Sequence, residues 1–178
     1  MIESTSSHPP RDKPDATSQN TRLTASASST ASELSNLKIR LHKSLRQFPD
    51  FPSPGILFED ILPLFADHTL HRSLIRALEL HVTSCYGEDQ KPDIIVGLEA
   101  RGFLCGPSLA LRLGAGFVPV RKPGKLPGPT ETAGFKKEYG EDFFEMQKDA
   151  IQPGQRVVVV DDIVATGRLT SHNLLSNF

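Results

Sequence analysis

The sequence predicts an α/β fold with a parallel, Rossmann-like sheet. Four consecutive valines at 157–160 form an apolar run that is typical of a strand buried on both faces, as strands of parallel sheets are. A strand at 93–98, a helix at 102–113 and a strand at 117–121 follow one another, and this succession implies a right-handed crossover. The 178 residues are enough for one ordinary domain.

Residues 1–31 differ in composition from the rest of the chain. They are rich in Ser, Thr, Pro and Ala and hold few large aliphatic side chains. Such a segment cannot bury enough apolar surface to offset the entropy lost on ordering, so we expect it to be disordered. Three acidic residues within it argue against a mitochondrial presequence. The folded domain is therefore expected at 32–178.

The first predicted elements are helices separated by a proline-rich loop. A helix should begin near Ser32, which can act as its N-cap, because leucines follow at helical spacing. Residues 48–55 carry three prolines and predict an extended loop. A second amphipathic helix is expected at 69–82, with Asp67 or Thr69 as its cap.

The remaining predicted elements are strands and one helix, connected by turns or loops that contain glycine or proline. In chain order they are a strand at 93–98, a helix at 102–113 closed by Gly114, a strand at 117–121, a long loop at 122–140, a short strand at 143–146, a turn at 153–154 and a strand at 156–160.

Composition excludes several classes of function. The net charge of −1 gives no general electrostatic case for binding nucleic acid or a membrane surface. Cys85 and Cys105 lack metal-ligand spacing and favour a reducing compartment over a disulfide scaffold. No apolar run approaches the roughly 20 residues that a membrane helix needs. We expect a protein of a reducing compartment with no membrane and no nucleic-acid partner.

The strongest candidate site follows the valine run. Asp161 and Asp162 stand where that strand should end, and a short loop with Thr166 and Gly167 comes next. Carboxylates can accept hydrogen bonds from ribose hydroxyls, and the backbone N–H groups of such a loop can hold a phosphate. The pattern favours a phosphorylated sugar as ligand. The alternative is a core strand that ends in a solvated turn.

Two further segments carry positive charge next to predicted strands. In 97–103, two glycines permit a tight turn into a helix, and Arg101 offers a fork of donors for phosphate oxygens. In 121–129, three cations enter a stiff Pro/Gly loop that could act as a moving lid. The alternatives are a simple strand-to-helix turn and a solvated basic loop.

Two segments offer groups that could cover a substrate. At 136–140, Tyr139 could close over a ribose or a phosphate, and Glu138 could relay a proton; the alternative is a polar hairpin end. Residues 48–60 are unusually apolar for a loop and could sandwich a planar base, whose edge free backbone groups would read. The alternative is a loop packed over the core.

Together these segments resemble the adenine phosphoribosyltransferases, purine-salvage enzymes of the type I phosphoribosyltransferase family. The resemblance covers about residues 48–167, and its motifs stand in the family's order. They are FPDFPSPGILFED at 48–60, GLEARGFLCGPSLA at 97–110, RKPGKLPG at 121–128, EYG at 138–140 and VVDDIVATG at 159–167.

The resemblance implies a pentosyltransferase that converts adenine and 5-phosphoribosyl-1-pyrophosphate to AMP and pyrophosphate. It implies Mg²⁺ held by substrate oxygens and water rather than by protein ligands, a phosphoribosyltransferase core with a flexible lid hairpin, and a cytosolic homodimer. The implied site residues are Leu57 and Phe58 for adenine; Arg101, Arg121 and Lys125 for pyrophosphate; Asp161 and Asp162 for the ribose hydroxyls; Ala165, Thr166 and Gly167 for the 5′-phosphate; Glu138 for proton transfer; and Tyr139 on the lid.

The sequence departs from the family pattern after residue 167. The family loop continues Ala-Thr-Gly-Gly-Thr, whereas Arg168 and Leu169 follow here. A strand-crossover unit needs about 30 residues, and 168–178 offers 11. We therefore expect the C-terminal helix and strands to be missing and the strand at 157–160 to form a sheet edge. The alternative functions are a non-catalytic fragment and a nucleotide-binding regulatory domain of phosphoribosyltransferase type.

Overall fold

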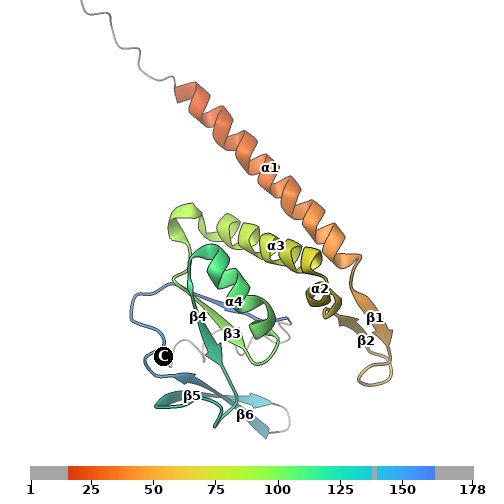
Figure 1. Ribbon diagram of the computed structural model, residues 1–178, viewed down its shortest axis with the longest axis vertical. Helices are drawn as coiled ribbons and strands as arrows, with labels where there is room; N and C mark the ends of the chain where they lie inside the picture. Colours follow the sequence, from red (N-terminus) through yellow and green to blue (C-terminus); the bar gives the residue numbers. More distant parts are fainter. Residues whose placement is uncertain (1–15, 138–139, 163–178) are drawn as a thin grey trace, which may run out of the picture.

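The first helix begins earlier than the sequence analysis predicts. The computed structural model describes residues 16–137 and 140–162, and its helix α1 spans Ala16–His42 (Figure 1). The prediction of disorder is therefore wrong for residues 16–31, whereas 1–15 lie outside the described part. Ser32 is not an N-cap, because its hydroxyl donates backwards to the carbonyl oxygen of Ser28 at 2.9 Å. No proline interrupts this segment, and extending an existing helix costs far less than starting one.

Helix α1 is held by its C-terminal half, which packs across α3 (His68–Tyr86), whereas its N-terminal half projects away from the rest of the molecule (Figure 1). An ion pair of 2.8 Å between Glu33 and Arg76 adds to this contact. The packing is made by leucines of the predicted helical pattern. The cluster contains Leu34, Leu37, Leu41, Leu45, Leu64, Leu70, Leu74 and Ala77.

The caps confirm the predicted start of α3 and both predicted ends of α4, whereas α3 continues to Tyr86, four residues beyond its predicted end at 82. Asp67 caps α3, because its Oδ1 accepts hydrogen bonds from the backbone N–H groups of Thr69 and Leu70 at 2.7 and 3.1 Å. Helix α4 spans Gly102–Leu113, as predicted, and ends at Gly114 in the left-handed conformation, with a φ of 74°. The single turn α2 (Pro63–Ala66) and the 3₁₀ turn η1 (Glu88–Gln90) were not predicted.

The central sheet is parallel, as predicted. It consists of β3 (Ile94–Leu98), β4 (Gly116–Val120) and β7 (Val157–Val160), in the order β4-β3-β7. Strand β3 is fully buried in the centre, and β7 is an edge strand in the described part of the chain. All four valines of β7 are half-buried rather than buried on both faces, because within residues 16–137 and 140–162 β7 has a strand neighbour on one side only.

The two hairpins correct two predicted loops. Strand β1 (Arg46–Pro49) pairs antiparallel with β2 (Leu57–Asp60), so the extended loop predicted at 48–55 shrinks to the hairpin tip. Strand β5 (Thr130–Lys137) pairs with β6 (Gly140–Gln147), although 122–140 was predicted as loop and only 143–146 as strand. Propensity alone could not show β5, because its apolar residue Ala133 is buried only by tertiary contacts.

These elements form three layers. On one face of the sheet, Ile95 packs against Val82 of α3 and Leu109 of α4. On the other face, residues of β3 and β4 pack against Phe144 and Met146 of the β5–β6 hairpin, which lies below the sheet in Figure 1. Among the helices of the described ranges, none combines the length and the apolar character that a membrane crossing requires.

Candidate active site

The segments predicted to bind a phosphorylated sugar meet at the edge of the sheet where its three strands have their carboxyl ends. Strands β3, β4 and β7 are parallel, so their carboxyl ends lie together. The chain continues from these ends with Glu99, Arg121 and Asp161. Ligands of open α/β sheets bind outside the carboxyl ends of the strands. The topology therefore places three of the predicted segments around one candidate site.

Glu99 joins the segment after β3 to the segment after β4. Its Oε1 accepts a hydrogen bond from Nη2 of Arg121 at 2.8 Å, and its Oε2 accepts one from the backbone N–H of Lys122 at 3.0 Å. The bond from the guanidinium lowers the pKa of Glu99, with the Lys122 N–H as the second cause. Glu99 thus fixes the start of the basic segment 121–129 with a charged side chain. Sequence reasoning did not single it out, although it stands inside the Gly-Leu-Glu-Ala-Arg-Gly motif.

Arg101 and Asp162, which were both predicted to bind substrate, contact each other. Arg101 Nε lies 3.0 Å from Asp162 Oδ2, and the aspartate side chain is only 11% exposed. The pair brings the turn that precedes α4 to the end of β7. A substrate that takes a hydrogen bond from Arg101 must therefore share or replace this ion pair.

The pKa of Asp161 is raised, whereas that of Glu99 is lowered. Its carboxyl group helps to line a cavity, and partial burial raises its pKa; the neighbouring charge of Asp162 acts in the same direction. Burial also raises the pKa of the Cys105 thiol on α4, with the two aspartates as further causes. The local environment thus disfavours added negative charge, and a cationic or hydrogen-bonding ligand would relieve it.

The first half of the basic loop at 121–129 is held by hydrogen bonds rather than free. Arg121 and Glu145 of β6 exchange backbone hydrogen bonds of 2.9 and 2.7 Å. The Glu145 side chain accepts a further bond from the Gly124 N–H at 3.0 Å. Arg121 Nη1 donates to the carbonyl oxygen of Lys125 at 3.1 Å, which leaves the Lys125 side chain at the exposed surface. Sequence reasoning missed Glu145, because its role depends on the unpredicted pairing of the hairpin.

A cavity of about 540 Å³ opens beside the two aspartates. Its floor is apolar, and Arg101, Asp161 and Asp162 supply its charged groups. The cavity lies between the helices and β7. Its apolar lining comes from the residues after β2 and from α3, α4 and β7, and includes Ile61, Leu64, Phe65, Leu78, Val82, Leu109 and Val160.

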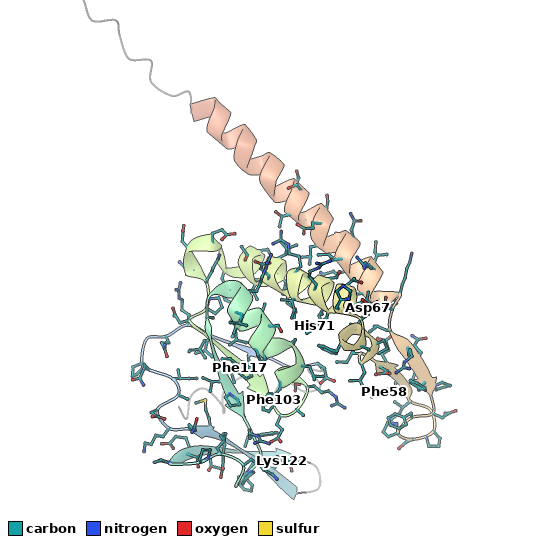
Figure 2. The ribbon with its side chains drawn as sticks, viewed as in Figure 1. Phe58, Asp67, His71, Phe103, Phe117 and Lys122 are labelled. Atoms are coloured by element: carbon teal, nitrogen blue, oxygen red, sulfur yellow. The ribbon has the colours of Figure 1, made fainter. Side chains whose placement is uncertain are left out.

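The residues predicted to hold adenine are not part of this cavity. Leu57 is 58% exposed on the β1–β2 hairpin, and Phe58 packs edge-to-face against Phe51 with ring centroids 5.0 Å apart. Figure 2 shows Phe58 at the hairpin and well away from Lys122 of the basic loop. The structure therefore brings Arg101, Asp161 and Asp162 together but leaves the adenine-binding candidates at a separate surface.

The remaining predicted site residues lie outside the described ranges. They are Glu138 and Tyr139, which stand between β5 and β6 in the sequence, and Ala165, Thr166 and Gly167, which follow β7.

Comparison with known proteins decides the family. The model of the phosphoribosyl transferase domain matches residues 70–169. The adenine phosphoribosyltransferase of Yarrowia lipolytica is 61% identical over 134 residues, which cover 75% of this chain and 73% of the relative. The chain belongs to the adenine phosphoribosyltransferase family. Its function is that of adenine phosphoribosyltransferases, which are glycosyltransferases.

Solved structures of adenine phosphoribosyltransferases share the fold. The Saccharomyces cerevisiae enzyme, in complex with an imino-altritol bisphosphate and adenine, superposes with a TM-score of 0.68 at 55% identity. The match covers 77% of this chain and 75% of that one. The Trypanosoma brucei enzyme with AMP, pyrophosphate and ribose-5-phosphate gives a TM-score of 0.63 at 25% identity, over 74% of this chain and 56% of that one. The predicted parallel-sheet core is confirmed.

Proposed function

We propose that the edge of the sheet at Glu99, Arg101, Arg121, Asp161 and Asp162 binds 5-phosphoribosyl-1-pyrophosphate for transfer to adenine. The observation that supports this most is the meeting of Arg101 and Asp162 at 3.0 Å, because it joins a cation suited to pyrophosphate to an acid suited to ribose hydroxyls. The relative from T. brucei was solved with AMP, pyrophosphate and ribose-5-phosphate, which are the classes of ligand that this site requires.

In this proposal each group of residues binds a different part of the substrate. Asp161 and Asp162 accept hydrogen bonds from the ribose hydroxyls, and Ala165, Thr166 and Gly167 hold the 5′-phosphate with backbone N–H groups. When the sugar engages Asp162, Arg101 exchanges its contact with that acid for the pyrophosphate oxygens.

The basic loop then stabilises the leaving group. Glu99 holds the guanidinium of Arg121 and the backbone of Lys122 in place, and the exposed Lys125 can turn towards pyrophosphate. Negative charge grows on pyrophosphate as it leaves the anomeric carbon, so preorganised cations lower the barrier to transfer. Tyr139 covers the site from the hairpin turn, and Glu138 takes part in proton transfer.

The site also fits Mg²⁺. The described residues contain no group of three or more His, Cys, Asp or Glu side chains that could hold a metal ion. Mg²⁺ needs no such cage, since it keeps several waters and binds through substrate phosphates and one or two carboxylates. We propose that pyrophosphate and ribose oxygens carry the ion, with Asp161 and Asp162 as the nearby acids. The bound ion would supply charge stabilisation for the leaving group.

Adenine is proposed to bind at the β1–β2 hairpin. The S. cerevisiae relative contains adenine. The hairpin offers apolar side chains on a rigid backbone. Asp60 fixes the hairpin, because its Oδ2 accepts two hydrogen bonds from the Arg46 guanidinium at 3.0 and 2.6 Å. Leu57 and Phe58 would contact the planar base after the hairpin and the sugar site approach each other.

The proposal extends to assembly and compartment. The exposed leucines of α4, Leu104 and Leu111, which are 38% and 84% exposed, support a homodimer. Two free cysteines support a reducing compartment, and we propose the cytoplasm.

The function is tested with the full chain by measuring AMP formation from adenine, 5-phosphoribosyl-1-pyrophosphate and Mg²⁺. We expect adenine to be preferred over hypoxanthine and guanine, and Arg101→Gln to reduce turnover at least tenfold. Lys91→Gln is the matched control, because Lys91 pairs only with the exposed Glu88 at 3.0 Å, away from the site. A preference for guanine or hypoxanthine would contradict the base assignment, and unchanged turnover in Arg101→Gln would contradict the site.

A further inference from the structure

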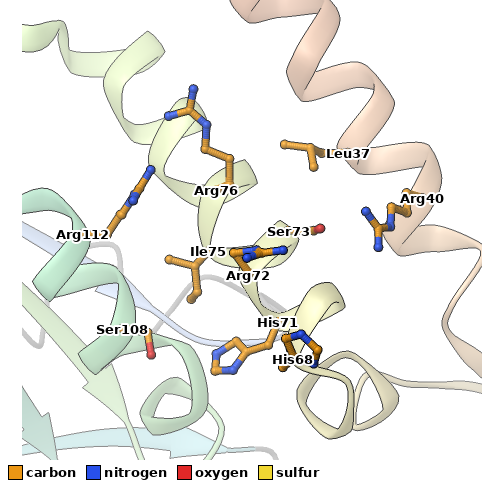
Figure 3. A pocket seen from close by; sticks show the side chains of 10 residues that line it. All are labelled: Leu37, Arg40, His68, His71, Arg72, Ser73, Ile75, Arg76, Ser108 and Arg112. Atoms are coloured by element: carbon orange, nitrogen blue, oxygen red, sulfur yellow. The ribbon is translucent and has the colours of Figure 1, made fainter.

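A second cavity lies on the outer side of the helical layer. Its volume is about 570 Å³, and it is formed where α1, α3 and α4 meet (Figure 3). The lining contains four arginines, two histidines and two serines, and no acidic residue. None of its lining residues belongs to the cavity beside Asp161 and Asp162.

The charges around this second cavity do not balance. Arg76 pairs with both Glu33 and Glu79, and Arg112 pairs with Glu79 at 2.9 Å. Two carboxylates thus neutralise two of the four guanidiniums. Arg40 and Arg72 remain without a carboxylate partner in the described chain. The excess charge is therefore +2, counted with neutral histidines, whereas the whole chain carries −1.

The hydrogen-bonding groups in the cavity are also incompletely used. Within the described ranges, the Arg72 side chain makes no hydrogen bond or ion pair, and Nε2 of His71 is buried without a partner. Arg40 makes a single neutral contact, a 3.2 Å bond from its Nη2 to the hydroxyl of Thr69. Nε2 of His71 is therefore the buried orphan of the cavity, whereas Arg40 and Arg72 are exposed and present solvated guanidiniums at its mouth. An anion in the cavity would give Nε2 of His71 an acceptor and the two guanidiniums a charged partner.

Figure 3 shows how the donors are distributed. Arg40 extends from α1 towards α3, Arg72 lies on α3 near the centre of the view, and the two histidines lie below it. Ser108 of α4 lies beside His71, on the side of the cavity away from Arg40. Donors from three different elements thus surround one space, which suits an anion with oxygens in several directions better than a flat carboxylate.

We propose that this cavity, named here the α1–α3–α4 cavity, binds a dianionic phosphate group. The dianion would match the excess charge of +2, with Arg40 and Arg72 as its charged partners and His71 and Ser108 as further donors. The group could be inorganic phosphate or the phosphomonoester of a nucleotide, because both present the same three oxygens. The inference does not depend on the function proposed for the sheet edge.

The test is a titration of the full ¹⁵N-labelled chain, followed by amide chemical shifts. Inorganic phosphate is the first probe, AMP the second, and sodium chloride at matched ionic strength the reference. We expect phosphate to shift the amides of His71, Arg72 and Ser108. If AMP shifts the same amides at a concentration at least tenfold lower than phosphate does, the site selects the nucleotide ester. If the two ligands need equal concentrations, the nucleoside adds nothing to binding and the phosphate group alone is recognised.

Arg40→Gln/Arg72→Gln is expected to weaken these shifts at least tenfold in apparent Kd, whereas the Lys91→Gln control should retain the wild-type Kd. Circular dichroism of the double variant checks that it is folded. The inference is overturned if the wild-type amides of this cavity respond no more to phosphate than to sodium chloride. It is equally overturned if the folded double variant binds as wild type does.

Discussion

Gly102 is the residue at which the geometry of the sheet edge is most sensitive to a single methyl group. It begins α4, and a Cβ built on it would overlap the backbone carbonyl oxygen of Val160 and lie 3.0 Å from the carbonyl carbon of Gly97. Both contacts are with backbone atoms, which cannot rotate away. Gly102→Ala must therefore push the turn after β3 away from the end of β7, and with it Arg101 from Asp162.

The magnitude follows from overpacking. Inserting a methyl group into a fully packed contact costs about 1–3 kcal/mol. Replacing glycine by alanine in a helix returns at most about 0.5–1 kcal/mol. We expect a net loss of about 1–2 kcal/mol, which corresponds to a lower Tm of roughly 2–8 °C for a chain of this size. Binding of 5-phosphoribosyl-1-pyrophosphate should fall at least tenfold, because the two halves of its site separate.

The matched control is Gly116→Ala at the start of β4. There the added Cβ would meet Cδ1 of Ile94 at 2.9 Å, which is the far end of a flexible side chain. Thermal unfolding and calorimetric titration of both variants provide the comparison. The reasoning is refuted if Gly102→Ala unfolds and binds like wild type, or if Gly116→Ala loses as much binding as Gly102→Ala does.

Three other substitutions test separate parts of the account. Asp67→Ala removes the cap of α3 and should lower the free energy of unfolding at neutral pH. Hydrogen bonds from Thr69 and Leu70 lower the pKa of Asp67, so the difference from wild type should shrink as pH falls through that pKa. A pH-independent difference in chemical denaturation would contradict this. Glu99→Gln should raise the KM for 5-phosphoribosyl-1-pyrophosphate several-fold with a smaller change in Tm, since its bond to Arg121 is weakened; an unchanged KM would remove Glu99 from the site. Burial raises the pKa of Asp161, so protonation of this group should weaken sugar binding at a higher pH than for an ordinary aspartate. In Asp161→Asn this loss of affinity at low pH should disappear. If it persists, another group is responsible for the titration.

The sequence predicts the elements whose signals are local. Helix α4 is found with its correct bounds, since Gly102 opens it and Gly114 closes it with a φ that favours glycine. The cap of α3 is predicted as Asp67 or Thr69, because both side chains carry an oxygen just before an apolar helical pattern, and the structure selects Asp67. The three parallel strands are found from apolar runs bounded by turns.

The errors concern elements that depend on distant partners. Residues 16–31 are helical because they extend a helix that is anchored by leucines further along the chain. Strands β1 and β5 pair across hairpins whose sequences contain prolines or lysines and show no clear alternation. Glu99 was missed for the same reason. Its partner Arg121 is 22 positions away in the sequence and becomes a neighbour only when β3 and β4 pair.

The central claim is that the acids after β7 bind the sugar of the phosphorylated substrate. Calorimetric titration of 5-phosphoribosyl-1-pyrophosphate with Mg²⁺ into the full chain and into Asp161→Asn/Asp162→Asn tests it most directly. The two substitutions keep the side-chain shape, remove both negative charges and replace one acceptor oxygen of each side chain by an NH₂ donor. The account predicts a loss of affinity of at least a hundredfold in the folded variant. Binding as tight as that of wild type would contradict it.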